Sequence, residues 1–141
     1  MLVAIGVVVV PLAGVAEQST IPRIGFLLMG SAQAGLTPLF DAFRAGLREL
    51  GWIENENIAI EYRFAGESPD QLPGLAADLV RLKVDVIIGS TAGIRAAQRV
   101  TTSIPIIMCI ADDAVRQGLV VNLARPGGNI TGLAAMTSEL A

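Results

Sequence analysis

Short polar segments follow three apolar runs of this sequence, and they contain the residue types best suited to chemistry. These segments are Gly30-Ser31-Ala32-Gln33, Gly89-Ser90-Thr91 and Asp112-Asp113. Their side chains offer hydroxyls, an amide and carboxylates, which together can hydrogen-bond a small polar molecule. Backbone N–H groups at neighbouring helix starts would also attract an anionic group. The candidate ligand-binding residues are Ser31, Gln33, Ser90, Thr91 and Asp112.

Four of these polar residues have a second interpretation. Ser90, Thr91, Asp112 and Asp113 are all of the residue types that cap the start of a helix. Helices that follow parallel strands all begin at one edge of the sheet, so capping and ligand contact both favour that edge. The sequence therefore leaves both roles open.

The elements that must position these residues alternate along the chain. Short apolar runs predict strands at residues 23–30, 57–64, 84–90, 104–111 and 129–136. Amphipathic stretches predict helices at residues 37–50, 68–83, 92–102 and 113–124. This alternation implies right-handed crossovers, so the predicted fold class is α/β: a doubly wound five-stranded parallel sheet in flavodoxin-like order. The carboxyl ends of its strands meet at one edge, where ligands bind in such folds.

Local signals refine four of these elements. Thr37 and Pro38 are typical of a helix start, and Ser68 with Gln71 fits a capping box. Residues 57–64 alternate apolar and polar side chains, which indicates an edge or half-covered strand. Cys109 lies within an apolar run, where we expect a small buried hydrophobe.

The composition excludes several classes of protein. The 141 residues carry a net charge of −3, and the ten Lys and Arg are scattered, so no basic face for nucleic acid is expected. There is no His, which removes the commonest base and metal ligand, and the single Cys cannot form an intrachain disulfide. The sequence also lacks a dinucleotide fingerprint, a phosphate loop and a nucleophile elbow. We therefore expect no enzymatic activity, no cofactor and no metal.

The N-terminal segment differs from the rest of the chain. Residues 1–16 are apolar after Met1 and end in Gly14-Val15-Ala16, small residues that suit signal-peptidase cleavage before Glu17. The segment is shorter than the roughly 20 residues of a membrane span, and it has no positively charged start. We interpret it as the apolar part of a secretory signal; an uncleaved anchor and a buried first strand are the alternatives. No Cys follows it, so export to the periplasm without a lipid anchor is expected.

Four segments carry a resemblance to a known family. They are AFRAGLRELGW, NIAIEYRFA, LPGLAADLVRLKVDVIIGSTA and GLVVNLARPGGNITGL, and the last is the most specific. Together they make residues 21–132 similar to the N-terminal lobe of ABC transporter substrate-binding proteins of the tryptophan and tyrosine type. The family has Asp-Pro after the fourth strand, whereas here Asp112 precedes Asp113, which puts the shape of that turn in doubt.

The resemblance implies a type I periplasmic-binding fold, in which two α/β lobes close on a ligand. Residues 17–135 would form the first lobe and residues 136–141 the start of the hinge and second lobe, so we expect a fragment of a longer gene product. The implied ligand is a small polar organic molecule, with an amino acid as the family example, and the implied partner is an ABC transporter permease, the only link to a membrane. Asp112 would pair with an ammonium group or cap its helix.

Two other functions stay open at this stage. One is an extracytoplasmic sensor domain of the same fold, which would pass ligand occupancy to a signalling module. The other is a small flavodoxin-like enzyme, against which the missing His and the missing phosphate-loop glycines argue.

Overall fold

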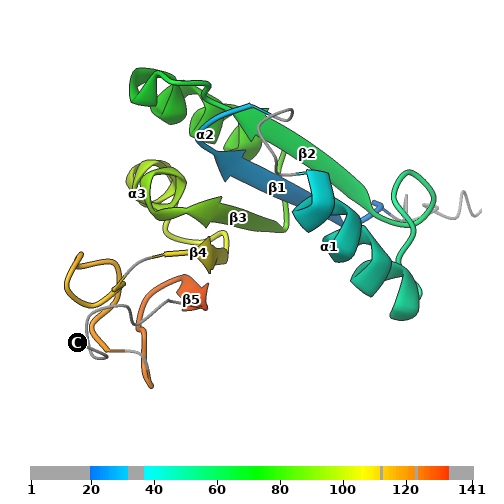
Figure 1. Cartoon of the computed structure of the whole chain (residues 1–141). Helices are drawn as coiled ribbons and strands as arrows, with labels where there is room; N and C mark the ends of the chain where they lie inside the picture. Colours follow the sequence, from blue (N-terminus) through cyan, green and yellow to red (C-terminus); the bar gives the residue numbers. More distant parts are fainter. Residues whose placement is uncertain (1–19, 32–36, 112, 123, 134–141) are drawn as a thin grey trace, which may run out of the picture.

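The computed structural model describes residues 20–31, 37–111, 113–122 and 124–133 (Figure 1). The predicted signal segment, Gln33, Asp112 and residues 136–141 lie outside these ranges. The domain boundaries given above therefore stay predictions.

The predicted parallel sheet is confirmed. Its five strands have the order β2-β1-β3-β4-β5, which is the flavodoxin-like order, and every neighbouring pair is parallel. The strand with alternating apolar and polar residues, β2, lies at the sheet edge as its pattern predicts. The strands are β1 (Arg23–Leu28), β2 (Ala59–Phe64), β3 (Val86–Ser90), β4 (Ile106–Ile110) and β5 (Ile130–Gly132).

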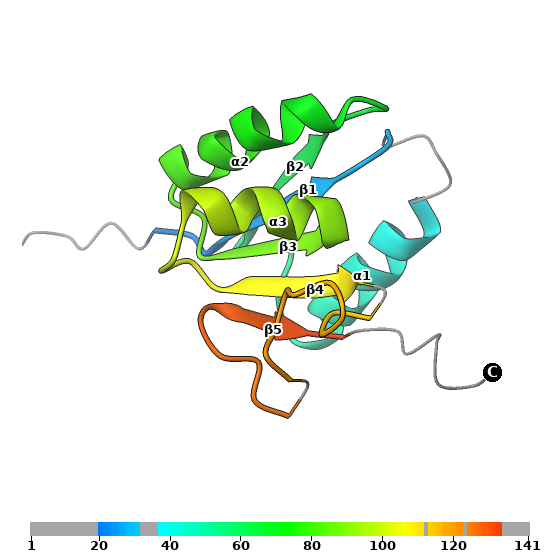
Figure 2. The ribbon, with the colours of Figure 1, turned by 90° about the vertical axis from the view of Figure 1, so that its left-hand side faces the viewer.

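Helices cover both faces of the sheet, as expected for a doubly wound fold. Helix α1 (Thr37–Glu49) lies on one face, whereas α2 (Leu72–Arg81, preceded by the 3₁₀ turn η1, Pro69–Gln71) and α3 (Thr91–Val100) lie on the other (Figures 1 and 2). Alternate residues of the strands explain this division, because neighbouring side chains in a strand point to opposite faces. In β1, Phe26 packs with α1, while Leu27 packs with α2 and α3.

The two faces are not covered equally. The core under α2 and α3 is the larger of the two and extends to β5. On the other face, Phe40 and Phe43 of α1 pack edge-to-face on Phe26, with ring centroids 5.3 and 5.1 Å apart. Because α1 packs over β1 and β2, it leaves the β4–β5 side of this face open (Figure 1).

The predicted helix at residues 113–124 is wrong. The described part of this segment forms turns, and its first turn is closed by a 3.0 Å hydrogen bond from the Gln117 N–H to the Asp113 carbonyl. Gly118 then takes a left-handed φ of 68°, and the N–H of Leu119 points back to the Ala114 carbonyl. A left-handed residue cannot continue a right-handed helix, so the winding ends after one turn. Burial of Ala114, Leu119 and Val120 explains why the apolar spacing resembled a helix face.

Two smaller expectations are also corrected. Ser68 forms no side-chain cap at η1; its backbone carbonyl instead accepts the Gln71 N–H at 3.2 Å. Strand β5 begins at Ile130, one residue later than predicted, and its Gly132 has a φ of 127° that few other residues adopt; the end of the predicted strand lies outside the described residues.

Candidate ligand-binding site

Polar residues gather, as predicted, at the sheet edge formed by the carboxyl ends of β1 and β3, which is called the polar edge below. These strands are adjacent and parallel, with Leu27 opposite Gly89, so the segments that follow them leave the sheet side by side. Ser31 lies beyond β1, Ser90 ends β3, and Thr91 begins α3. The structure thus brings Ser31, Ser90 and Thr91 to one edge. Whether Gln33 and Asp112 join them stays a prediction, since both lie outside the described residues.

The backbone before Ser31 is held by a pair of glycines that sequence reasoning missed. Gly30 and Gly66 exchange two backbone hydrogen bonds of 2.8 and 3.0 Å, which extend the contact between β1 and β2 beyond the sheet. Both glycines have left-handed φ angles, 82° and 60°, which other residues adopt at a cost. The exposed Ser31 therefore follows a fixed anchor point.

The start of α3 is not capped by its own serine. Ser90 precedes the helix with an extended backbone (φ −79°, ψ 171°), but its side chain makes no capping hydrogen bond. Capping was one of two roles that the sequence left open for Ser90, and the structure excludes it. Its half-buried hydroxyl and the first N–H groups of α3 lie at the same edge.

The Asp113 side chain caps a backbone N–H, as one interpretation of the sequence proposed, but it caps a turn and not a helix. Its Oδ1 accepts the Arg116 N–H at 3.1 Å, and its Oδ2 lies 3.5 Å from the Arg116 Nε. Its φ of 42° is left-handed, a conformation that Asp tolerates better than most residues. A Pro, the residue expected here from the family, cannot adopt this angle. This turn therefore differs from one built on Asp-Pro.

Close backbone packing fixes the β3–α3 junction, and this feature was also missed from the sequence. A Cβ added to Gly93 would lie 3.0 Å from the Leu27 carbonyl carbon and closer still to its oxygen. A Cβ on Gly89 would lie 2.9 Å from the same oxygen. Helix α3 can thus begin directly against β1 only because both positions lack a side chain. The spacing Gly-x-x-x-Gly was the available signal.

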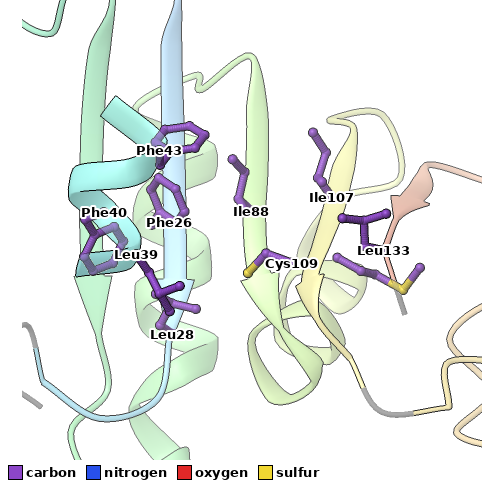
Figure 3. A pocket seen from close by; sticks show the side chains of 10 residues that line it. Phe26, Leu28, Leu39, Phe40, Phe43, Ile88, Ile107, Cys109 and Leu133 are labelled. Atoms are coloured by element: carbon purple, nitrogen blue, oxygen red, sulfur yellow. The ribbon is translucent and has the colours of Figure 1, made fainter. Parts of the chain in front are cut away.

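An apolar groove of about 350 Å³ lies on the α1 face of the sheet (Figure 3). Phe26, Leu28 and Phe40 form one wall, and Ile107 and Leu133 form the other. Cys109 also lines it and is exposed, so the expectation of a buried cysteine is wrong. The reason is that α1 does not reach across β4. The groove offers few polar groups, and the residues of the polar edge do not line it.

The two large polar aromatic residues, Trp52 and Tyr62, lie away from the polar edge. Trp52 lies between α1 and β2, at the opposite edge of the sheet. Tyr62 is in the edge strand β2, where its ring stacks on Phe26 with centroids 5.6 Å apart, and the Arg44 guanidinium carbon lies 5.5 Å from its ring centroid. Its buried hydroxyl has no hydrogen-bond partner among the described residues, and burial raises the pKa of this phenol above its ordinary value.

In the part of the chain that the structure describes, no group of three or more His, Cys, Asp or Glu side chains is arranged to hold a metal ion. Within the same ranges, no helix has the length and apolar character needed to cross a membrane.

The fold and the position of the polar edge define the class of the chain: it has the architecture of one lobe of a periplasmic-binding protein, with a parallel sheet whose loops at one edge can face a ligand. Residues 32–139 match the family of ABC transporter substrate binding proteins. The chain therefore belongs to that family.

Known relatives agree with this assignment. A tyrosine-binding protein of Clostridioides difficile (strain R20291) is 34% identical over 109 residues, which are 74% of this chain and 32% of that protein. The ligand-free, open structure of a substrate binding protein with adhesive properties from Clostridium difficile has a TM-score of 0.75 at 28% identity, covering 84% of this chain and 40% of that one.

A second solved structure supports the fold. An ABC domain in complex with L-Trp from Streptococcus pneumonia has a TM-score of 0.71 at 24% identity, covering 80% of this chain and 38% of that one. The chain thus spans about a third of the curated relative and about two fifths of these structures.

Proposed function

We propose that this chain is the first lobe of an exported solute-binding component of an ABC importer, and that its ligand is a small polar organic molecule of the aromatic amino-acid class. Family membership supports the transport role. The ligand class is supported by the relative named as tyrosine-binding and by the similar fold solved with L-Trp.

The observation that carries the proposal is the uncapped start of α3. A hydroxyl at a helix start usually accepts a hydrogen bond from a backbone N–H in the first turn of that helix. The Ser90 side chain makes no such hydrogen bond. The first-turn N–H groups of α3 and the Ser90 hydroxyl therefore stay available to an anionic group. An amino-acid carboxylate has the charge and the size to occupy that position.

The other candidate residues follow from this orientation of the ligand. The Thr91 hydroxyl would donate a second hydrogen bond to the carboxylate. Ser31 and Gln33 would contact the polar part of the ligand from the neighbouring loop. Asp112 would pair with the ammonium group. Aromatic stacking would have to come from the second lobe, because Trp52 and Tyr62 lie away from this edge.

The remaining parts of the proposal concern the whole protein. Residues 17–135 would form the lobe, with residues 136–141 entering the hinge, and the partner would be a permease in the membrane. A site between two lobes buries most of its ligand, so one lobe alone should bind in the millimolar range, equivalent to about 4 kcal/mol.

The test is an NMR titration of the ¹⁵N-labelled chain with L-tryptophan. We expect amide shifts at Ser31, Ser90 and Thr91, and about tenfold weaker binding in Ser90→Ala, because a hydrogen bond to a charged group is lost. The matched control is Ser103→Ala, since Ser103 is exposed in the loop at the opposite edge.

Indole serves as the control ligand because it lacks the carboxylate and ammonium groups. Shifts that are absent, that lie elsewhere, or that indole reproduces at the same residues would contradict the proposed recognition.

A further inference from the structure

The pairing of β3 with β4 contains an irregularity beside the proposed ligand edge. Gly89 pairs with Met108, but the next residue, Ser90, pairs with Ile110. Strand β4 therefore has one extra residue, Cys109, opposite the Gly89–Ser90 peptide. Such a bulge disrupts the hydrogen-bond ladder locally and bends the strand that contains it.

The side chain of Cys109 bridges this irregularity. Its thiol donates to the Gly89 carbonyl, with the sulfur 3.4 Å from the oxygen. Figure 3 shows the side chain leaving β4 in the direction of β3. Since Gly89 directly precedes Ser90, the thiol holds the backbone at the point where the chain turns from the sheet into α3.

The same backbone is confined from the other side. An added Cβ on Gly89 would lie 2.9 Å from the Leu27 carbonyl oxygen and 3.4 Å from the Ile94 nitrogen. Gly89 thus lies between the backbone of β1 and the thiol of β4. Close packing prevents Gly89 from moving nearer to β1. On the β4 side, the hydrogen bond from the Cys109 thiol restricts the direction of the Gly89 carbonyl.

We propose that Cys109 is a positioning residue for the ligand edge: by holding the Gly89 carbonyl at the β4 bulge, it sets the direction in which Ser90 and Thr91 leave β3. This inference rests on the proposed function for its consequence in binding. It assigns no ligand contact to the sulfur itself.

The test compares Cys109→Ala, which removes the donor, with Cys109→Ser, which keeps a donor of similar size. Amide hydrogen exchange at Ser90, the last paired residue of β3, is measured by NMR in the free chain, with L-tryptophan affinity measured separately. A thiol hydrogen bond is weak, so we expect roughly twofold to fivefold faster exchange and a similar loss of affinity in Cys109→Ala. Cys109→Ser should restore both.

Two controls separate positioning from general destabilisation. Ile107→Val changes the same strand and the same groove but leaves the thiol in place, so Ser90 should exchange as before. Exchange at Leu79, a wholly buried residue of α2, reports on global opening, so acceleration at Ser90 that exceeds the acceleration at Leu79 is a local effect.

The inference would be overturned if Cys109→Ala and Cys109→Ser had the same exchange rates and the same affinity for L-tryptophan. It would also be overturned if neither variant differed from the unmodified chain. If the unmodified chain fails to bind L-tryptophan while exchange at Ser90 responds to the two variants as expected, the proposed function fails and the positioning of the backbone by Cys109 stands. The two hypotheses are thereby distinguishable.

Discussion

Replacing Gly93 by alanine tests the close packing of α3 on β1. The added methyl carbon would lie 3.0 Å from the Leu27 carbonyl carbon and 3.3 Å from the Leu27 Cγ, with the carbonyl oxygen closer than either. Carbon atoms in contact prefer about 3.5–4.0 Å. The obstacle is the backbone of a strand with neighbours on both sides, β2 and β3. The helix must therefore move away from the sheet.

The magnitude follows from two opposing terms. Overpacking a well-packed core costs about 1–3 kcal/mol, and a clash with fixed backbone belongs at the upper end of that range. Alanine in place of a helical glycine stabilises by about 1 kcal/mol. The expected net effect is a loss of about 2 kcal/mol in the free energy of unfolding, or roughly thirtyfold in the folding equilibrium.

The assay is equilibrium urea unfolding followed by far-ultraviolet circular dichroism. Gly46→Ala is the matched control, because Gly46 is in α1 and an added Cβ meets no atom within 4 Å. We expect that variant to gain about 0.5–1 kcal/mol. A Gly93→Ala variant as stable as the unmodified chain, with the same denaturant slope, would refute the packing argument.

Three further predictions concern other parts of the molecule. Asn57→Ala should cost about 2 kcal/mol in urea unfolding, because the Asn57 side chain accepts the Ile53 N–H at 2.7 Å and donates to the Gly51 carbonyl at 2.8 Å; an unchanged midpoint would contradict this role. The phenol of Tyr62 should titrate above pH 10.0 by absorbance, since burial raises its pKa, and stability should fall as the pH rises through that range, because the unfolded chain releases the proton first; Tyr62→Phe should lose this part of the pH dependence. N-terminal sequencing of the protein exported from a two-membrane bacterium should begin at Glu17, and a retained Met1 would contradict cleavage there.

Much of the fold could be predicted because it depends on patterns that are local in the chain. Apolar runs and amphipathic stretches gave the strands and three of the four expected helices, and alternation in residues 57–64 correctly indicated the edge strand β2. Those patterns reflect how each segment must divide its side chains between core and solvent. They therefore predict a strand or a helix without knowledge of which elements lie beside it.

The segment at residues 113–124 shows the limit of such patterns. Its apolar residues are buried, as predicted, but they reach the core from turns. Spacing alone does not separate a helix face from a folded-back turn of the same length. The left-handed φ of Gly118 makes the difference, and the preceding residue, Gln117, is tied to α3 by a 2.7 Å hydrogen bond from the Arg95 side chain to its carbonyl.

The site was predictable in its residue types but not in their roles. The sequence brought Ser31, Ser90 and Thr91 to one edge, because parallel strands all end there. Only the tertiary structure decided that Ser90 leaves α3 uncapped, that Asp113 serves its own turn, and that Cys109 is the extra residue of a bulge. The bulge depends on the pairing of β3 with β4, and the other two roles depend on side-chain geometry at the start of a helix or turn, which residue types alone do not determine. The order of the residues fixes which groups are present, and packing of the strands and helices determines which of those groups remain available to a ligand.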